Sequence, residues 1–478
     1  MPSTAPTTIE QLRERHGPQF RWLVLLTVMV GMMASIMSST IVNVAVPDMS
    51  RYFHLGQDRA QWISAAFMAA TTLSLLLTPW LLQRYGLRRT YFGATLLLMA
   101  GGIVGGLSGN YPVMITMRVL EGIAAGILTP IPNVVIMREF PPNQQGRAIG
   151  IFGFGVVLAP AIGPVVGGIL VEAFGWRSIF FVVVPFCLAA LELARRFLPM
   201  VSTFVTQPKP FDWTGLFLAT AATLAVLNGL VEFQGEHTAR GAILLGAGIL
   251  CFAAFAFHQL QAAHALLQMR LFMHQPFRMG AIVAFVYGVG LFGSTYLLPV
   301  YLQAALGFSP SRAGFIMLPA GLALAITMPV AGRLADKLRA SWLVAGGVAV
   351  LAASLALTAT VSPQTSAIVL MLWVVLGRIG IGTVMPALSL GSMRGLGPPE
   401  IPQAASMGNF LRQLGGAVGI SLVGILLEWR LAAHGVTLLG AGGEAERVAA
   451  FDESFLLLAA ICVPAIVAGW FMEPRARL

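Results

Sequence analysis

Long apolar runs dominate this sequence and limit the folds open to it. A run of about 20 apolar residues is long enough to cross a lipid bilayer as a helix. Backbone groups in lipid must hydrogen-bond within their own segment, so the runs are predicted to be transmembrane helices. Fourteen such runs occur, at residues 22–46, 60–82, 91–108, 112–137, 148–171, 178–197, 213–231, 241–260, 277–303, 313–335, 341–360, 366–388, 404–427 and 454–472.

Composition excludes a soluble multidomain protein. Of the 478 residues, 57% are hydrophobic and only 10% are charged, whereas a soluble chain carries roughly a quarter charged residues. The net charge of +10 would indicate nucleic acid in a soluble protein. In a membrane protein, basic residues instead set the orientation of the helices, and no nucleic-acid partner is expected.

The basic residues of the loops orient the predicted helices. With both termini placed in the cytoplasm, 19 of the 29 basic residues fall in cytoplasmic segments and 7 in outer segments. The other three lie inside helices: Arg118, Arg378 and Arg412. This bias is the one that the positive-inside rule requires of an even number of spans. We expect an integral membrane protein with both termini cytoplasmic.

An internal repeat divides the chain. Gln83 and Asp336, which follow the second and tenth runs in similar segments, lie 253 residues apart, and Pro130 and Pro386 lie 256 residues apart. Two adjoining six-helix halves would repeat at about 190 residues, so about 60 residues remain for two more helices. The predicted fold is an all-α polytopic membrane protein with two six-helix bundles related by a parallel pseudo-repeat, plus two inserted helices. Its predicted parts are a cytoplasmic tail (1–20), an N-terminal bundle (21–198), a linker with the two inserted helices (199–276), a C-terminal bundle (277–472) and a second cytoplasmic tail (473–478).

Cysteines and lysines give no sign of a cofactor, metal or nucleotide site. Cys187, Cys251 and Cys462 lie far apart inside apolar runs, which is typical of packing residues and not of a metal site. The two lysines, Lys209 and Lys337, are followed by Pro and Leu, whereas a phosphate-binding loop needs Ser or Thr after its lysine. We therefore expect no cofactor and no direct use of ATP.

Charged residues inside the predicted helices are candidates for function, because insertion of each costs about 2.5–3.5 kcal/mol at the helix centre. Arg118 and Glu121 lie three residues apart, so they share one helix face and can pair. Glu121 is the only carboxylate expected deep in a helix of either bundle. Our hypothesis is that it binds a coupling proton; the alternative is a permanent ion pair between helices. For Arg378 and Arg412 we keep a carboxylate partner, a substrate anion or carbonyl groups as alternatives.

Several motifs resemble those of one transporter family. Residues 39–47 read STIVNVAVP, Arg118–Gly122 read RVLEG, residues 155–168 read GVVLAPAIGPVVGG, residues 211–213 read FDW, and residues 409–416 read NFLRQLGG. Together they resemble the major facilitator superfamily, and within it the 14-helix drug/proton antiporters of the EmrB/QacA type. Three positions depart from the pattern. Ser38 stands where the branch usually has Asp, Glu121 replaces the Gln of the branch pattern Arg-Val-x-Gln-Gly, and Gln83 stands where the family often has Asp.

The resemblance implies roles for several groups of residues. Candidates for substrate binding or coupling are Ser38, Thr40, Asn43, Arg378, Asn409 and Arg412. The cytoplasmic gating motif is carried by Gln83, Arg84, Gly86 and Arg88, with Asp336 and Lys337 in the second half. It implies a charge latch that holds one conformation; the alternative is that these charges only set topology.

The antiporter motif implies a hinge and a close helix contact in the fifth span. Its residues are Gly155, Pro160, Gly163, Pro164, Gly167 and Gly168. Glycines let another backbone approach closely, and prolines remove helix hydrogen bonds. The alternative is ordinary packing of small residues.

The function implied by the resemblance is that of a secondary transporter. It would export lipophilic, cationic or amphiphilic drugs in exchange for protons by alternating access, with small lipophilic substrates, protons and membrane lipid as its partners. Relatives of this kind can work with a periplasmic adaptor and an outer-membrane channel, and the loop at 428–453 leaves that alternative open. Other readings are an uncoupled facilitator, an exporter of one metabolite, or a membrane enzyme or lipid-handling protein. An enzyme is disfavoured because residues 428–453 contain no catalytic constellation.

Overall fold

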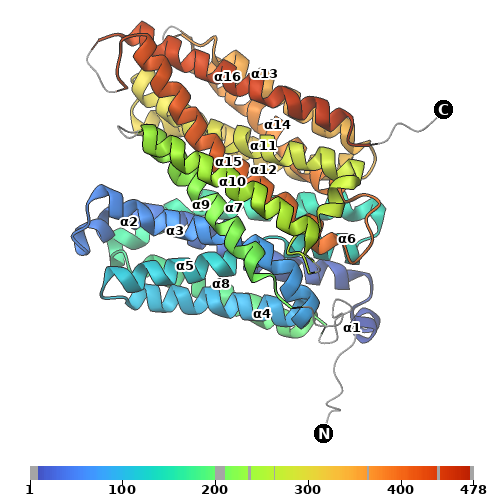
Figure 1. Ribbon diagram of the computed structural model, residues 1–478. Helices are drawn as coiled ribbons and strands as arrows, with labels where there is room; N and C mark the ends of the chain where they lie inside the picture. Colours follow the sequence, from blue (N-terminus) through green and yellow to red (C-terminus); the bar gives the residue numbers. More distant parts are fainter. Residues whose placement is uncertain are drawn as a thin grey trace, which may run out of the picture. The chain divides into compact units, whose positions relative to one another are not determined.

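The computed structural model describes residues 9–199, 210–234, 238–262, 264–362, 365–438 and 442–473, and these ranges contain helices and no strands. The predicted Lys209 and the segment 474–478 lie outside them. The helices (Figure 1) are α1 (Ile9–His16), η1 (Gly17–Gln19), α2 (Phe20–Tyr52), α3 (Gln57–Ser74), η2 (Leu75–Leu77), α4 (Thr78–Leu107), α5 (Tyr111–Leu128), α6 (Ile131–Glu139), η3 (Pro142–Gln144), α7 (Gln145–Phe174), α8 (Ser178–Phe197), α9 (Trp213–Gln234), α10 (Thr238–Gln261), η4 (Met269–Met273), α11 (Gln275–Val300), η5 (Tyr301–Ala305), α12 (Pro310–Ala335), α13 (Ala340–Thr358), α14 (Ala367–Met393), α15 (Ile401–Ala433) and α16 (Glu444–Trp470).

Twelve stretches of the described residues are long and apolar enough to cross a membrane. The protein is therefore an all-α integral membrane protein, but the predicted count of fourteen spans is not confirmed. Two predicted runs, 60–82 and 91–108, fall in one continuous stretch of 49 residues, Arg59–Leu107, that joins α3, η2 and α4. The predicted run 148–171 lies within the 30-residue helix α7, which is not among the twelve.

A loop was predicted between the second and third apolar runs, and the structure has a kink at a glycine there instead. Inside α4, Gly86 has φ 78° and ψ 173°, which is not helical. A side chain at this positive φ would be strained, whereas glycine adopts it readily. The hydroxyl of Thr90 donates to the carbonyl oxygen of Leu81 at 3.0 Å and bridges the kink. The chain therefore bends at Gly86 with almost no intervening loop.

The two prolines of the predicted repeat act differently. Pro130 lies in a turn between α5 and α6, so the run 112–137 forms two helices. Pro386 lies inside α14, which continues to Met393. A proline in a helix removes one backbone hydrogen bond, and the neighbouring packing decides whether the helix bends or ends.

The chain packs as two compact units. The first unit comprises Met1–Leu216 and Leu396–Met407. In it α2 packs against α3, α5, α7 and α8, and α4 packs against α5 and α8. Short helix connections and apolar helix faces favour this bundle of adjacent helices. The functional candidates on α2, α3, α4 and α5 therefore lie within one packed group.

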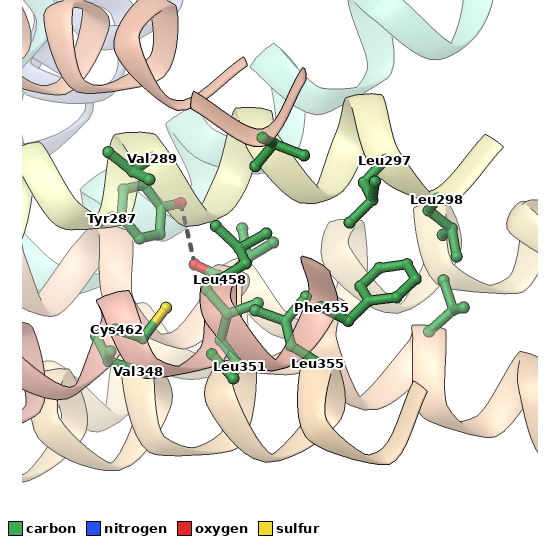
Figure 2. Packing of buried hydrophobic residues seen from close by; sticks show 14 of the residues in the cluster. Tyr287, Val289, Leu297, Leu298, Val348, Leu351, Leu355, Phe455, Leu458 and Cys462 are labelled. Carbon is green, nitrogen blue, oxygen red and sulfur yellow. Dashed lines mark hydrogen bonds between the residues drawn. The ribbon is translucent and has the colours of Figure 1, made fainter. Parts of the chain in front are cut away.

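The second unit comprises Phe217–Gly395 and Gly408–Leu478. Within it α13 packs against α14 and α16, and α11 packs against α14 and α16. Figure 2 shows the interior of this unit, where Leu351, Leu355 and Leu458 lie between Tyr287 and Phe455. On α12 the side chains of Phe315, Leu318, Leu322 and Ile326 are instead exposed, as expected of a helix face that contacts lipid.

The predicted runs 213–231 and 241–260 are present as the helices α9 and α10. They approach each other closely, because a Cβ atom on Gly229 would lie 2.8 Å from the backbone nitrogen of Leu245 and one on Gly248 would lie 2.6 Å from Val226 Cγ2. Their outer faces carry exposed apolar side chains, among them Leu250 at 71% exposure. Both are among the twelve candidate spans.

Candidate functional site

A buried ion pair on α5 is the centre of the candidate site. The helix begins after Asn110, whose side chain accepts a hydrogen bond from the backbone nitrogen of Val113 at 3.0 Å. Eight and eleven residues beyond this cap, Arg118 Nη1 and Glu121 Oε2 lie 2.5 Å apart, and their side chains are 0% and 1% exposed. The predicted spacing of three residues thus brings the two charges together on one helix face.

Helices α2 and α3 hold the guanidinium of Arg118 in place. Its Nε donates to the carbonyl oxygen of Ile63 at 3.0 Å, and its Nη1 lies 3.3 Å from both the carbonyl oxygen and the hydroxyl of Ser38. The guanidinium also lies over the ring of Phe67, 4.4 Å from its centroid, a favourable cation–π arrangement. Ser38 therefore contacts the charged pair directly.

Two glycines of α4 make room for Glu121, and sequence reasoning missed them. A Cβ atom on Gly101 would lie 2.6 Å from Glu121 Cγ, and one on Gly102 would lie 3.5 Å from Glu121 Oε1. A larger residue at position 101 would therefore force either the carboxylate or α4 to move. The sequence signal was the Gly-Gly pair itself inside an apolar run, which often marks a close approach.

Each member of the pair keeps one unused polar atom. Within the described part of the chain, Glu121 Oε1 and Arg118 Nη2 have no hydrogen-bond partner. A buried polar atom without a partner costs free energy. A carboxylate oxygen in this position can take up a proton while the other oxygen stays beside Arg118. The arrangement can therefore exist with the carboxyl group charged or neutral.

The glycines of the predicted antiporter motif form a contact between α7 and α2. A Cβ atom on Gly163 would lie 2.8 Å from the hydroxyl oxygen of Thr40, and one on Gly167 would lie 2.6 Å from Ile41 Cγ1. On Gly155 it would lie 2.5 Å from the sulfur of Met29. By contrast, nothing lies within 4 Å at Gly168, and Pro160 is exposed. The side chain of Pro164 lies outside the described residues.

Two further predicted residues of α2 bind their neighbours. The hydroxyl of Thr40 donates to the carbonyl oxygen of Ile36 at 3.0 Å. Asn43 Oδ1 accepts a hydrogen bond from the hydroxyl of Ser64 on α3 at 2.7 Å. Thr40 and Asn43 therefore hydrogen-bond to Ile36 and Ser64. Ser38 is the α2 candidate that hydrogen-bonds to the ion pair.

The predicted gating residues lie at helix ends and kinks. The guanidinium of Arg84 lies 5.4 Å from the ring centroid of Trp80 and 5.6 Å from that of Tyr85. Within the described ranges, neither Arg84 nor Arg88 forms an ion pair, and Gln83 is partly buried. In the second unit Asp336 is the C-cap residue of α12 and Lys337 is exposed. The charge latch therefore stays a prediction.

The second unit holds the other two predicted arginines. Arg378 Nη1 and Nη2 donate to the hydroxyl of Thr295 at 3.2 and 3.3 Å. Arg412 Nη2 donates to Asn409 Oδ1 at 3.0 Å. Asn409 and Arg412, both taken from the same predicted motif, are thus brought together by one turn of α15.

Helix α16 adds carboxylates that sequence reasoning placed outside a span. The helix begins at Glu444, ten residues before the predicted run 454–472. Asp452 and Glu453 therefore lie within it, and Glu453 pairs with Arg430 and lies 3.4 Å from His434 Nε2. Both residues of the Arg430–Glu453 pair are more than a third exposed, unlike the buried pair on α5.

Comparisons with known proteins point to one family. The sequence profile of the Major Facilitator Superfamily matches residues 28–420. The chain is 31% identical over 415 residues to a Mycobacterium tuberculosis protein described as a multidrug resistance protein B homolog, covering 85% of this chain and 76% of that protein. It is 29% identical over 413 residues to the tetracenomycin C resistance and export protein of Streptomyces glaucescens, covering 86% and 76%. Its fold matches that of the human organic anion transporter MFSD10 with a TM-score of 0.67 at 16% identity, covering 92% of this chain and 99% of that one.

Proposed function

The chain belongs to the major facilitator superfamily and is therefore a secondary transporter of small molecules, and we propose that it exports drugs in exchange for protons. The substrates we propose are lipophilic, cationic or amphiphilic compounds. Relatives described as multidrug resistance and antibiotic export proteins support export. Because this family consists of transporters and not enzymes, the enzyme alternative is dropped.

The buried pair of Arg118 and Glu121 carries the proposal of proton coupling. Glu121 is fully buried, so proton exchange with water requires another conformation in which the carboxyl group is reached. Arg118 favours the charged carboxylate, whereas removal from water favours the neutral acid. Any conformational change that alters the contact between the two residues therefore changes proton affinity. Alternating access would couple this change to substrate release.

Replacing the carboxyl group by an amide tests the coupling. We expect Glu121→Gln to abolish export of ethidium driven by an imposed pH gradient in proteoliposomes, because the amide keeps the shape of the side chain and binds no proton. The matched control is Glu192→Gln, which removes an exposed carboxylate that pairs with Arg196 on α8. This control should transport like the wild type.

Three outcomes separate the remaining alternatives. Ethidium movement that never responds to the pH gradient in the wild type would favour an uncoupled facilitator. Gradient-driven export that survives in Glu121→Gln would leave Arg118 and Glu121 as a permanent ion pair and move the proton site elsewhere. An exporter of one metabolite would show gradient-driven transport of that compound and none of ethidium.

The topology we propose has fourteen spans with both termini in the cytoplasm of a bacterial inner membrane. The kink at Gly86 supports two passes within Arg59–Leu107, and the 30-residue helix α7 is long enough for another. The bias of basic residues toward one set of loops supports the orientation. Two further expectations stay predictions. One is the division into bundles at 21–198 and 277–472 with an inserted pair of helices within 199–276. The other is an adaptor with an outer-membrane channel.

A further inference from the structure

A cavity lies at one end of the first unit, between the start of α2 and the end of α6. It has a volume of about 610 Å³ and opens to the surroundings beside the exposed residues Arg13, Gly17 and Pro18. Its inner wall includes the buried rings of Phe20 and Phe140. Helices α1 and α6 lie at the same end of the first unit's helices (Figure 1). A cavity of this volume is large enough to hold a small ligand.

The cavity lies where two predicted spans end. Arg21 is the second residue of α2, directly before its predicted apolar run, and Glu139 is the last residue of α6, two residues after its predicted run. The rings of Trp22 and Phe140 meet edge to face there, with centroids 4.9 Å apart. Tryptophan is enriched at the boundary between membrane and water. The cavity is therefore at the depth of lipid headgroups, outside the hydrocarbon core.

Positive charge predominates in the lining of the cavity. Three arginines, Arg13, Arg21 and Arg138, face one glutamate, Glu139, which leaves a surplus of two positive charges. Glu139 Oε2 lies 2.9 Å from Arg13 Nη2, so its charge is balanced by that arginine. A cleft lined by one sign of charge attracts ions of the opposite sign. The lining therefore favours an anion.

Arg21 has unused capacity to donate hydrogen bonds. Within the part of the chain that the structure describes, Arg21 Nε is buried and has no hydrogen-bond partner, and no carboxylate forms an ion pair with this residue. Its guanidinium lies 5.7 Å from the ring centroid of Phe140. A buried donor without an acceptor costs free energy, and the oxygen of a bound anion would remove that cost.

We propose that this cavity binds a phosphate group, supplied either by the headgroup of an anionic phospholipid or by a soluble phosphate compound. Arginine suits this ligand because its planar N–H groups match phosphate oxygens. Basic clusters at the end of a span also attract anionic lipids. The site goes beyond the proposed export function and does not depend on it. The competing explanation is that the three arginines only orient the helices in the membrane.

Binding of two lipids to the purified full-length protein, measured by native mass spectrometry, tests the site. The probes are dioleoylphosphatidylglycerol, which is anionic, and dioleoylphosphatidylcholine, whose phosphate is balanced by a positive charge. We expect the wild type to bind phosphatidylglycerol about tenfold more tightly than phosphatidylcholine. Arg21→Gln should weaken phosphatidylglycerol binding about fivefold and leave phosphatidylcholine binding unchanged. The matched control is Arg15→Gln, an exposed arginine of α1 outside the lining, which should bind both lipids like the wild type.

A second variant changes the affinity in the opposite direction. Glu139→Gln removes a negative charge from the lining and frees Arg13, so we expect phosphatidylglycerol binding about fivefold tighter than in the wild type. If Glu139 served only to hold α6 in place, its loss would bring no gain in affinity. The thermal unfolding temperature of each variant without added lipid shows whether the fold is kept.

Two results would overturn the site. One is equal affinity of the wild type for the two lipids together with no binding of inorganic phosphate. The other is unchanged phosphatidylglycerol binding in a folded Arg21→Gln or Glu139→Gln variant. Inorganic phosphate at millimolar concentration identifies the source of the ligand. Displacement of phosphatidylglycerol would assign the cavity to soluble phosphates, and binding that persists would assign it to the lipid.

Discussion

Gly101 provides the space that Glu121 occupies, so its replacement should disable the proposed proton site without touching a charge. In Gly101→Ala the new methyl carbon would lie 2.6 Å from Glu121 Cγ, and either the carboxylate or α4 must move. Overpacking of this kind costs about 1–3 kcal/mol. We expect gradient-driven ethidium export to fall at least tenfold and the thermal unfolding temperature to fall.

The matched control is Gly93→Ala on the same helix, where nothing lies within 4 Å of the added atom. It changes the helix propensity of α4 in the same way and should keep wild-type export. Wild-type export by both variants would mean that the position of Glu121 does not matter for transport. An equal loss of export in both variants would mean that the effect comes from α4 and not from the carboxylate.

Ser38 offers a test of whether the charge or the position of the acid matters. Its hydroxyl lies 3.3 Å from Arg118 Nη1, so an aspartate there can reach the same guanidinium. We expect Ser38→Asp to restore at least a tenth of the gradient-driven export that Glu121→Gln loses, when the two changes are combined. Ser39→Asp serves as the control, because Ser39 bonds Ile36 instead. Rescue by both aspartates, or by neither, would contradict a shared proton site beside Arg118.

The sequence predicted the pair of Arg118 and Glu121 but not the residues that surround it. The spacing of Arg118 and Glu121 places them on one helix face wherever the helix packs, which is a local property. The contacts with Ser38, Phe67 and Gly101 join helices that are separated in the chain, and no local pattern encodes such distances.

The contact between α7 and α2 depends on the size of single residues along a helix. We expect Gly163→Val to reduce export at least tenfold while the protein still reaches the membrane in normal amounts, because its side chain would meet the hydroxyl of Thr40, only 2.8 Å from the added Cβ. Gly168→Val is the control, since that position is open. Wild-type export by Gly163→Val would show that close packing of these helices is dispensable.

A second seam of glycines joins α11 and α15 and was not predicted. A Cβ atom on Gly415 would collide with the carbonyl oxygen of Phe285, and one on Gly419 would lie 2.6 Å from Val289 Cα. Because backbone cannot rotate away as a side chain can, we expect Gly415→Ala to lower the thermal unfolding temperature by several degrees. Gly408→Ala, in the same helix with nothing within 4 Å, should unfold like the wild type. Equal unfolding temperatures in the two variants would contradict the close approach.

The sequence predicts a helix well where the length of an apolar run determines it. It predicts helix ends and kinks less well, because these depend on backbone geometry. The inserted helices α9 and α10 follow directly from two apolar runs. The turn at Pro130 and the kink at Gly86 do not, because the same residue types are accommodated differently by their neighbours, as the uninterrupted helix at Pro386 shows. Helix boundaries also differ from the prediction: α16 begins ten residues before its predicted run.

The distribution of charge over the whole molecule follows two separate rules. Most basic residues lie outside the predicted spans, where they set orientation at little cost. The three arginines deep inside them are costly and lie in two different settings: Arg118 is paired with an acid, whereas Arg378 and Arg412 bond the neutral groups of Thr295 and Asn409.

The number of spans decides on which side of the membrane every later loop lies. The stretch Arg59–Leu107 has 49 residues, so as one straight helix it would be about 74 Å long, against a hydrocarbon core of about 30 Å. We therefore predict two passes that meet at Gly86. Cysteines introduced singly at the exposed Gly56 and Gly109, with the three native cysteines replaced by alanine, should both react with an impermeant maleimide from the same side. A cysteine at Arg89 should react only from the other side. Labelling of Gly56→Cys and Gly109→Cys from opposite sides would establish a single pass and invert the orientation proposed for everything that follows.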